Sequence, residues 1–255
     1  MSNLKTQPLI LITNDDGVDS KGLELIIEIV RDITSNYIVV APKNNCSGYS
    51  HSITLSRPIR LNKLCDKLYS CNGSPTDCVM IALSLLFKSK KPDLIISGIN
   101  LGENLGDDVT YSGTVGAALE GAFSNIKSIA ISKSRPGLNE KDDWTAVRKF
   151  IPDIIDNFFT KKSMIVNVNV PNVSSSKVKG TKYTKLARRK PKGKFLVRKD
   201  DKGIPYYWLT TERSKGKIES NTDIWAINNK YISITPLRLD ITDSSFLEKN
   251  MGLKS

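Results

Sequence analysis

Short apolar runs alternate with amphipathic segments along the first two-thirds of the chain. The apolar, β-branched runs predict buried strands at residues 9–13, 37–41, 93–97, 128–132 and 164–170. Segments with apolar residues at helical spacing predict helices at residues 22–33, 77–87, 115–123 and 142–159. Strands separated by helices form a mainly parallel sheet covered on both faces. We therefore predict an α/β fold with helices flanking such a sheet.

The pattern changes after Pro171. Residues 177–217 are basic and contain glycines on either side of the aromatic run Tyr206-Tyr207-Trp208, which indicates a β-hairpin arm. Residues 226–239 are β-branched and predict a return to β structure. We expect one α/β domain over residues 1–255, with a core at about 1–175, the arm at about 176–220 and a C-terminal return segment at about 221–255.

The net charge of +12 is concentrated in the predicted arm. Residues 1–130 carry 12 Lys and Arg against 13 Asp and Glu, whereas residues 177–217 alone carry 15 basic and 3 acidic residues. Such a segment can bind the phosphate backbone of a nucleic acid, but a run of charges is more often a solvated arm. Both interpretations stay open from the sequence.

The chain lacks the signals of export or membrane insertion. No apolar run approaches the roughly 20 residues that cross a bilayer, and the first residues have neither a basic nor a long apolar region. The four cysteines show no Cys-x-x-Cys spacing, so a zinc site is a poor fit and reduced thiols are expected. We expect a cytoplasmic protein with no membrane partner.

Two adjacent carboxylates, Asp15 and Asp16, follow the first predicted strand and precede Gly17. Ligands of open α/β sheets lie outside the carboxyl ends of the strands. Two ionised neighbours repel each other, and a bound cation is the commonest reason for such a pair. A solvated Asp-Gly turn is the alternative for this segment on its own.

Three further polar loops, residues 44–52, 97–108 and 111–114, follow strands or open helices. Right-handed crossovers bring the loops after parallel strands to one rim of the sheet, so we expect these loops to meet the aspartates. In the last loop, Ser112-Gly113-Thr114 precedes a helix and either binds an anion at the helix N-terminus or caps the helix.

The single histidine narrows the chemistry. With only His51, a multi-histidine zinc or iron centre is excluded, and no Gly-x-Ser-x-Gly sequence supports a Ser-His-Asp hydrolase. A metal site here must use oxygen donors, which favours Mg²⁺, Mn²⁺ or Ca²⁺.

Other candidate residues are weaker. His51 and the pair Asp107-Asp108 can have structural rather than functional roles, and Cys46 has no basic residue nearby that would favour its thiolate. The first strand is not followed by Gly-x-Gly-x-x-Gly, so a dinucleotide site is weakly supported.

Taken together, the sequence motifs of this chain resemble those of the SurE family, the stationary-phase survival 5′/3′-nucleotidases. The likeness covers nearly the whole length and is carried by Thr13-Asn14-Asp15-Asp16-Gly17, Ser47-Gly48, Pro75-Thr76-Asp77-Cys78, Ser97-Gly98-Ile99-Asn100, Asn104-Leu105-Gly106-Asp107-Asp108, Tyr111-Ser112-Gly113-Thr114 and Tyr231-Ile232-Ser233-Ile234-Thr235-Pro236-Leu237.

The resemblance implies a Rossmann-like fold and a divalent-metal-dependent phosphatase acting on nucleoside monophosphates. It implies one Mg²⁺ or Mn²⁺ held by residues matching Asp15, Asp16, Ser47 and Asn100. It implies that Asn104, Ser112, Gly113 and Thr114 surround the phosphate. It also implies a C-terminal hairpin and extension that build homodimers or homotetramers.

We therefore expect a metal-assisted phosphomonoesterase that hydrolyses nucleoside 5′- and 3′-monophosphates, with Asp15 and Asp16 as catalytic residues and candidates for the general base. The main alternative is an RNA-binding module that uses the arm at 177–217. A nucleotide- or sugar-binding protein without turnover is a third possibility.

Overall fold

A nine-stranded sheet forms the centre of the computed structural model, which describes residues 7–188, 191–213 and 218–251. The strand order is β3-β4-β2-β1-β5-β6-β7-β11-β8, and the six strands from β4 to β7 are parallel. The strands are β1 (Ile10–Thr13), β2 (Tyr37–Pro42), β3 (Leu61–Cys65), β4 (Leu68–Cys71), β5 (Leu94–Leu101), β6 (Lys127–Lys133), β7 (Ile165–Val170), β8 (Thr181–Tyr183) and β11 (Ile232–Pro236).

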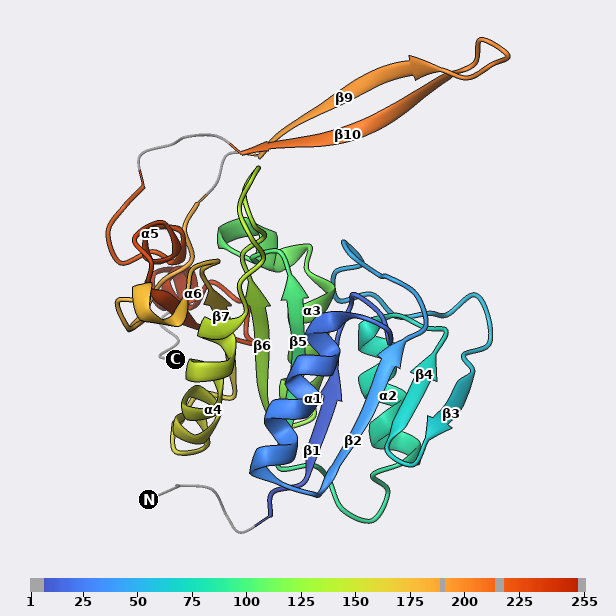
Figure 1. Cartoon of the computed structure of the whole chain (residues 1–255), viewed down its shortest axis with the longest axis vertical. Coiled ribbons are helices and arrows are strands. Elements are labelled where there is room, and N and C mark those ends of the chain that lie inside the picture. The colour runs from blue at the N-terminus through green and yellow to red at the C-terminus, as the bar shows by residue number, and fades with distance from the viewer. Residues whose placement is uncertain (1–6, 189–190, 214–217, 252–255) are drawn as a thin grey trace.

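Helices cover both faces of the sheet (Figure 1). Helices α1 and α4 lie together on one face, and α2 and α3 lie on the other. The helices are α1 (Lys21–Ile33), α2 (Pro75–Leu85), α3 (Gly113–Phe123), α4 (Thr145–Phe159), α5 (Asp223–Asn228) and α6 (Ser244–Met251), with short 3₁₀ turns η1 (Gly106–Thr110) and η2 (Ser175–Lys177). The α/β fold with a mainly parallel, flanked sheet is thus confirmed.

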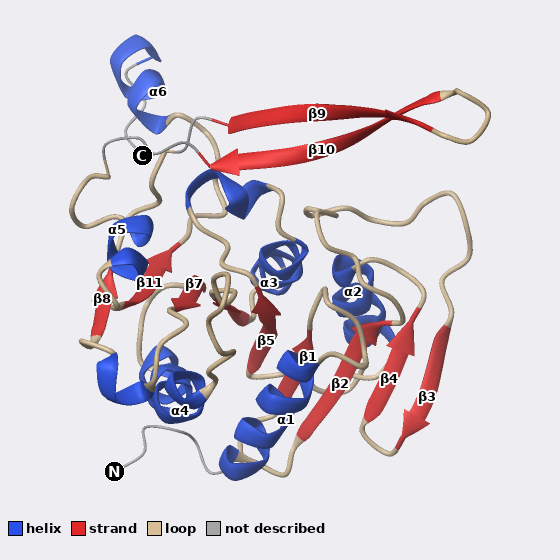
Figure 2. Ribbon diagram, turned by 45° about the horizontal axis from the view of Figure 1, so that its top comes forward, coloured by secondary structure: helices blue, strands red, loops and turns tan. Residues whose placement is uncertain are grey.

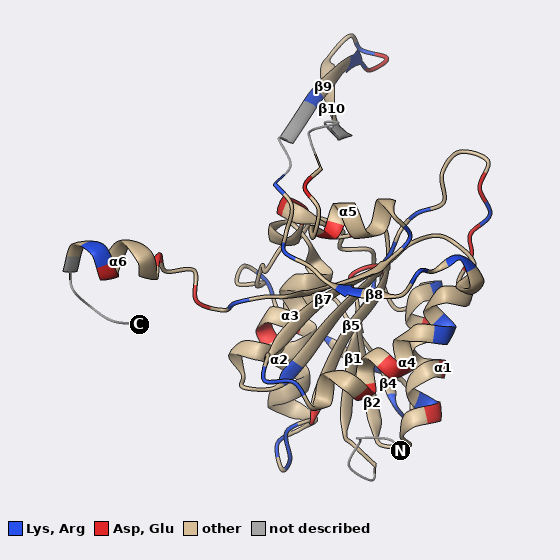
Figure 3. Cartoon of the chain, turned by 90° about the vertical axis from the view of Figure 1, so that its left-hand side faces the viewer, with Lys and Arg blue, Asp and Glu red and all other residues tan. Residues whose placement is uncertain are grey.

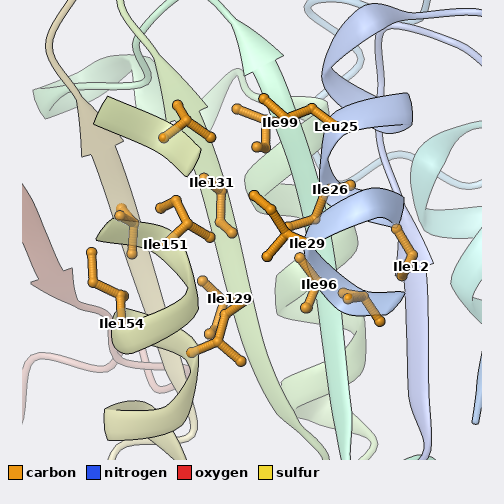
Figure 4. Packing of buried hydrophobic residues seen from close by; sticks show 14 of the residues in the cluster. Ile12, Leu25, Ile26, Ile29, Ile96, Ile99, Ile129, Ile131, Ile151 and Ile154 are labelled. Atoms are coloured by element: carbon orange, nitrogen blue, oxygen red, sulfur yellow. The ribbon is translucent and has the colours of Figure 1, made fainter. Parts of the chain in front are cut away.

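The core follows from the alternation of side chains along the buried strands. Ile10 and Ile12 of β1 belong to the cluster under α1 and α4, whereas Leu11 between them belongs to the cluster under α2. Figure 4 shows the first cluster, in which isoleucines of the sheet pack against Ile26 and Ile29 of α1 and against α4. Helices therefore cover both faces of the central strands, and a site is expected at the edge where the parallel strands end.

Several elements differ from the sequence-based expectation, which also contained neither strand β8 nor helix α6. The pair β3 and β4, which extends the sheet past β2, was not predicted, because β3 is mostly exposed and carries polar residues. The first part of the expected β segment at 226–239 was wrong: residues 226–228 end helix α5, whose N-terminus is capped by the Thr222 side chain. The second part is correct, since β11 pairs antiparallel with β7.

The hairpin arm consists of β9 (Pro191–Lys199) and β10 (Pro205–Arg213), which pair antiparallel and form a sheet of their own. It projects beyond the end of the main sheet at which the parallel strands finish (Figures 1 and 2). The arm is shorter than expected, because β8 lies within the predicted arm region but pairs with β11 in the main sheet.

Helix α6, near the C-terminus, also stands away from the body of the protein (Figure 3). Within the described ranges, no helix is both long and apolar enough for a membrane span.

Candidate metal and phosphate site

The two adjacent aspartates end strand β1 and turn toward different neighbours. The Thr114 hydroxyl at the start of α3 donates to Oδ1 of Asp15 at 2.6 Å. The Leu101 N–H at the end of β5 donates to Oδ2 of Asp16 at 3.0 Å. Asp15 is buried and Asp16 is partly buried. The carboxylates are thus fixed by a helix start and a strand end that are distant from them in sequence.

Burial raises the pKa of both carboxyl groups. The pKa of Asp15 rises from 3.8 to about 6, chiefly because burial disfavours the charged form, while the hydrogen bond from Thr114 opposes that rise and the charge of Asp16 adds to it. The pKa of Asp16 is also raised by burial, and the hydrogen bond from Leu101 and the charge of Arg135 oppose that rise. A cation bound between the two groups would stabilise their charged forms.

The loop after β2 reaches the same place. The Cys46 N–H donates to the backbone oxygen of Asp15 at 2.7 Å, and the Asn45 side chain donates to Oδ1 of Asp16 at 3.4 Å. Oδ1 of Asn45 in turn accepts from the Ser47 N–H at 2.8 Å. This places Ser47 beside the carboxylates, with an exposed side chain whose hydroxyl is accessible to a ligand.

Gly17 permits this approach. Its φ of +101° belongs to the region that favours glycine, and a Cβ there would lie 3.2 Å from the backbone carbon of Asn44. The sharp turn after the aspartates therefore brings the loop of Asn45 and Ser47 against the end of β1.

Asn100 lies near the end of β5, one residue before the Leu101 N–H that binds Asp16. Its Nδ2 donates to the Gly102 oxygen at 2.7 Å, so the amide is oriented with Oδ1 left as a potential ligand atom.

Asn104, in contrast, is buried. Its Nδ2 donates to the Ser132 hydroxyl at 2.8 Å and to the Thr114 hydroxyl at 3.4 Å. In this structure Asn104 therefore supports Thr114 through its side chain.

The N-terminus of α3 faces the aspartates. A Cβ on Gly113 would lie 2.9 Å from the Cβ of Asp15, so only glycine allows the helix to come this close. Ser112 caps the helix by accepting from the Val115 N–H at 3.1 Å, as the cap interpretation predicted. Capping and anion binding are compatible here, because a cap fixes the position of the remaining free N–H groups of the first turn.

Of the weaker candidates, His51 has a structural role. Nε2 of His51 lies 2.9 Å from a Glu120 oxygen, and the His51 ring stacks on Phe123 with centroids 5.7 Å apart. Burial raises the pKa of the Cys46 thiol, which disfavours a thiolate nucleophile. Asp107 and Asp108 lie in η1, next to the loop that leads to Ser112.

Sequence reasoning missed Arg135. Its Nε donates to the Leu101 oxygen at 2.9 Å, and Leu101 in turn binds Asp16 through its N–H. Gly102 leaves room for the guanidinium, since a Cβ there would lie 3.0 Å from Nε of Arg135. Arg135 stands in an exposed loop after β6, where no motif or periodicity singles it out.

The donor set fits a hard divalent cation. Asp15 and Asp16 offer carboxylate oxygens, Ser47 a hydroxyl and Asn100 an amide oxygen, and such ligands suit Mg²⁺ or Mn²⁺. In the part of the chain that the structure describes, no group of three or more His, Cys, Asp or Glu side chains could hold a metal ion. A cation here therefore needs the neutral oxygens as well as the two carboxylates.

Comparison with known proteins identifies the family of this chain. The family model for survival protein SurE matches residues 10–193. The chain is 40% identical to the 5′-nucleotidase SurE of Erythrobacter litoralis over 93% of this chain and 96% of that protein. It is 39% identical to the 5′-nucleotidase SurE of Paramagnetospirillum magneticum over 91% of this chain and 90% of that protein.

The fold matches a solved structure as well. The crystal structure of the SurE protein from Aquifex aeolicus superposes with a TM-score of 0.81 and 36% sequence identity, covering 97% of this chain and 100% of that chain. The matched residues include the site at the ends of β1 and β5 and the start of α3. The family resemblance inferred from the sequence is confirmed, and this chain belongs to the SurE family.

Proposed function

We propose that this protein is a divalent-metal-dependent phosphomonoesterase that hydrolyses nucleoside 5′- and 3′-monophosphates. The observation that carries the proposal is the convergence of Asp15, Asp16 and the N-terminus of α3, joined by the hydrogen bond from Thr114 to Asp15. Relatives named 5′-nucleotidase that cover most of the chain support the 5′-nucleotidase part of this proposal.

In this proposal Asp15, Asp16, Ser47 and Asn100 hold one Mg²⁺ or Mn²⁺. The bound cation would supply charge neutralisation at a phosphate oxygen and a lower pKa for an attacking water. A carboxylate of the aspartate pair accepts the proton of the attacking water. The free N–H groups at the start of α3, with Gly113 and Thr114, bind the remaining phosphate oxygens and favour their negative charge. Asn104 and Ser112 fix that helix start in position.

A substrate panel tests the proposal. Purified protein with Mn²⁺ or Mg²⁺ is expected to release phosphate from nucleoside 5′- and 3′-monophosphates, and excess chelator is expected to stop the release. Full activity in excess chelator would contradict metal dependence. Activity on the 5′-esters alone would restrict the proposal to a 5′-nucleotidase.

A second copy of the chain is the proposed partner of the arm. Opposed residues of a hairpin share a face, so the register places Phe195, Val197, Tyr207 and Leu209 on one face. All four are about 60% exposed, and a two-stranded hairpin is marginally stable by itself. We propose that this apolar face packs in a homodimer or homotetramer. Light scattering should give a mass above one chain, and Tyr207→Ser with Leu209→Ser should lower it.

RNA binding remains the second candidate function, and the opposite face of the arm favours it. That face carries Lys194 and Arg198 together with Tyr206 and Trp208. Cations beside exposed aromatic rings are the features of single-stranded nucleic-acid surfaces. RNA binding through the arm would survive Asp16→Ala and would weaken with added salt, whereas the phosphatase activity would be lost in that variant.

A further inference from the structure

Two exposed tyrosines flank the candidate phosphate site. Tyr111 immediately precedes Ser112, the cap of α3, and its side chain is 66% exposed. Tyr49 follows Ser47 by two residues, and its side chain is 52% exposed. An exposed aromatic side chain offers a large flat face to a ligand, so two of them beside the same site can form part of that site.

Hydrogen bonds hold the two tyrosines in one structural unit. The Ser50 N–H donates to the backbone oxygen of Tyr111 at 3.0 Å, and the Ser50 hydroxyl donates to the Thr110 oxygen at 2.6 Å. The Tyr49 N–H donates to the Cys46 oxygen at 3.2 Å. The loop of Ser47 and the loop before α3 are therefore bound to each other through the residues next to the tyrosines.

Close packing reinforces this contact. A Cβ on Gly116 of α3 would lie 2.5 Å from the Ser50 oxygen, so the helix and the loop touch through their backbones. The two exposed tyrosines are therefore attached to backbones that hold each other in place. A frame of this kind binds a flat ligand with little loss of its own freedom.

The geometry points to Tyr49 and Tyr111 as the binding residues for the base of the nucleotide, a role that rests on the proposed function. A nucleoside monophosphate whose phosphate lies at the start of α3 extends its sugar and base outward from the buried aspartates. Tyr49 and Tyr111, in the two loops beside that site, offer exposed aromatic rings to such a base. Base–aromatic stacking tolerates any base, because every base has a π-face. The inferred subsite therefore favours phosphate esters that carry an aromatic base, with little selection among bases.

Nearby aromatic residues are less suitable for this role. The His51 ring is stacked on Phe123 and bound to Glu120, so its face and one nitrogen are already engaged. Neither tyrosine takes part in a stacked pair or a cation–π contact within the described residues. Their rings are therefore available to a ligand.

The test compares two substrates that differ only by the base. Values of kcat/KM are measured with Mn²⁺ for adenosine 5′-monophosphate and for ribose 5-phosphate, in the wild type, Tyr111→Ala, Tyr49→Ala and Tyr111→Phe. We expect each alanine variant to lose about fivefold to 100-fold on the nucleotide, mainly through KM, which corresponds to about 1–3 kcal/mol. Ribose 5-phosphate should be hydrolysed as by the wild type, and Tyr111→Phe should keep the activity on both substrates.

Tyr183 provides the matched control, because it is 61% exposed on β8 at the far edge of the sheet. Tyr183→Ala should change neither substrate. An equal loss on both substrates in Tyr111→Ala and Tyr49→Ala would overturn the base subsite and show a role in shaping the loops. No loss on either substrate would overturn it as well.

Failure of the proposed function gives a different result. If the wild type hydrolyses neither substrate, calorimetric titration with adenosine 5′-monophosphate decides the subsite alone. Weaker binding in both alanine variants would then support the base subsite, and unchanged or absent binding would overturn it.

Discussion

The Thr114 hydroxyl donates a 2.6 Å hydrogen bond to Oδ1 of Asp15, which joins the start of α3 to the end of β1. This bond favours the charged form of a carboxylate that burial would otherwise neutralise. One side chain thus links the proposed phosphate site to the proposed metal site.

Thr114→Val is expected to weaken metal binding. The substitution keeps the shape of the side chain but removes the donor, so the pKa of Asp15 rises above its present value of about 6 and the metal must displace a proton more often. A hydrogen bond to a charged group contributes about 1.5–3 kcal/mol, so proton competition should lower the Mn²⁺ affinity at pH 7 about twofold to 15-fold in calorimetric titration. Thr110→Val, in which an exposed hydroxyl bonded to Asp107 is lost, serves as the control. Unchanged affinity in Thr114→Val would contradict this role.

The raised pKa of Asp15 makes the metal-free protein less stable as the pH rises. The folded-state pKa is about 6 against an ordinary 3.8, so the protonated form is favoured by folding. The associated stability is fully present below about pH 4 and is lost as the pH rises through about 6, a difference of about 3 kcal/mol. Asp15→Asn should therefore stabilise the metal-free protein in urea unfolding at pH 8. The gain should vanish near pH 4, and a gain of equal size at both pH values would contradict the assignment.

Gly22→Ala is expected to destabilise the protein and to disturb the site. A Cβ on Gly22 would lie 1.8 Å from the Ile99 oxygen, a backbone atom that cannot move aside alone. Helix α1 must therefore shift away from β5, which carries the Leu101 N–H that binds Asp16. We expect a loss of at least about 2 kcal/mol in urea unfolding and lower phosphatase activity. Lys21→Ala, at the preceding exposed position, should cost far less.

Arg135→Gln should move the acid limb of the pH–activity profile to higher pH. The charge of Arg135 opposes the burial that raises the pKa of Asp16, so its removal leaves Asp16 protonated over a wider range. The expected shift is measured from kcat/KM against pH. Arg148→Gln removes an arginine that pairs with Glu28 at 2.7 Å, and it should leave the profile in place. Identical profiles for Arg135→Gln and the wild type would rule out this effect.

The sequence predicted the parts of the fold that depend on local pattern. The apolar run ending at Thr13 and the helical spacing after Gly22 indicated β1 and α1 because each buries a single, regular face. The proximity of Asp15 and Thr114 was also predictable, because right-handed connections between parallel strands place the loops after those strands at one edge of the sheet. These features need no knowledge of distant contacts.

The features that sequence reasoning missed depend on tertiary contacts. β3 is an edge strand whose exposed positions carry no apolar alternation, so only its pairing with β4 defines it. Helix α5 is short and depends on the Thr222 cap, which overrides the β-branched character of the segment. Arg135 has no local signal, because its role comes from the Leu101 oxygen that its Nε contacts.

The central claim is that Asp15 and Asp16 hold a cation that activates phosphate-ester hydrolysis. Its most direct test is the rate of phosphate release from adenosine 5′-monophosphate as Mn²⁺ is added, compared between the wild type and Asp16→Asn. The wild type should be inactive without metal and reach a saturating rate, while Asp16→Asn should lose at least about 100-fold of that rate at every Mn²⁺ concentration. A metal-free wild type that is fully active, or an Asp16→Asn variant with the same Mn²⁺ dependence, would contradict the claim.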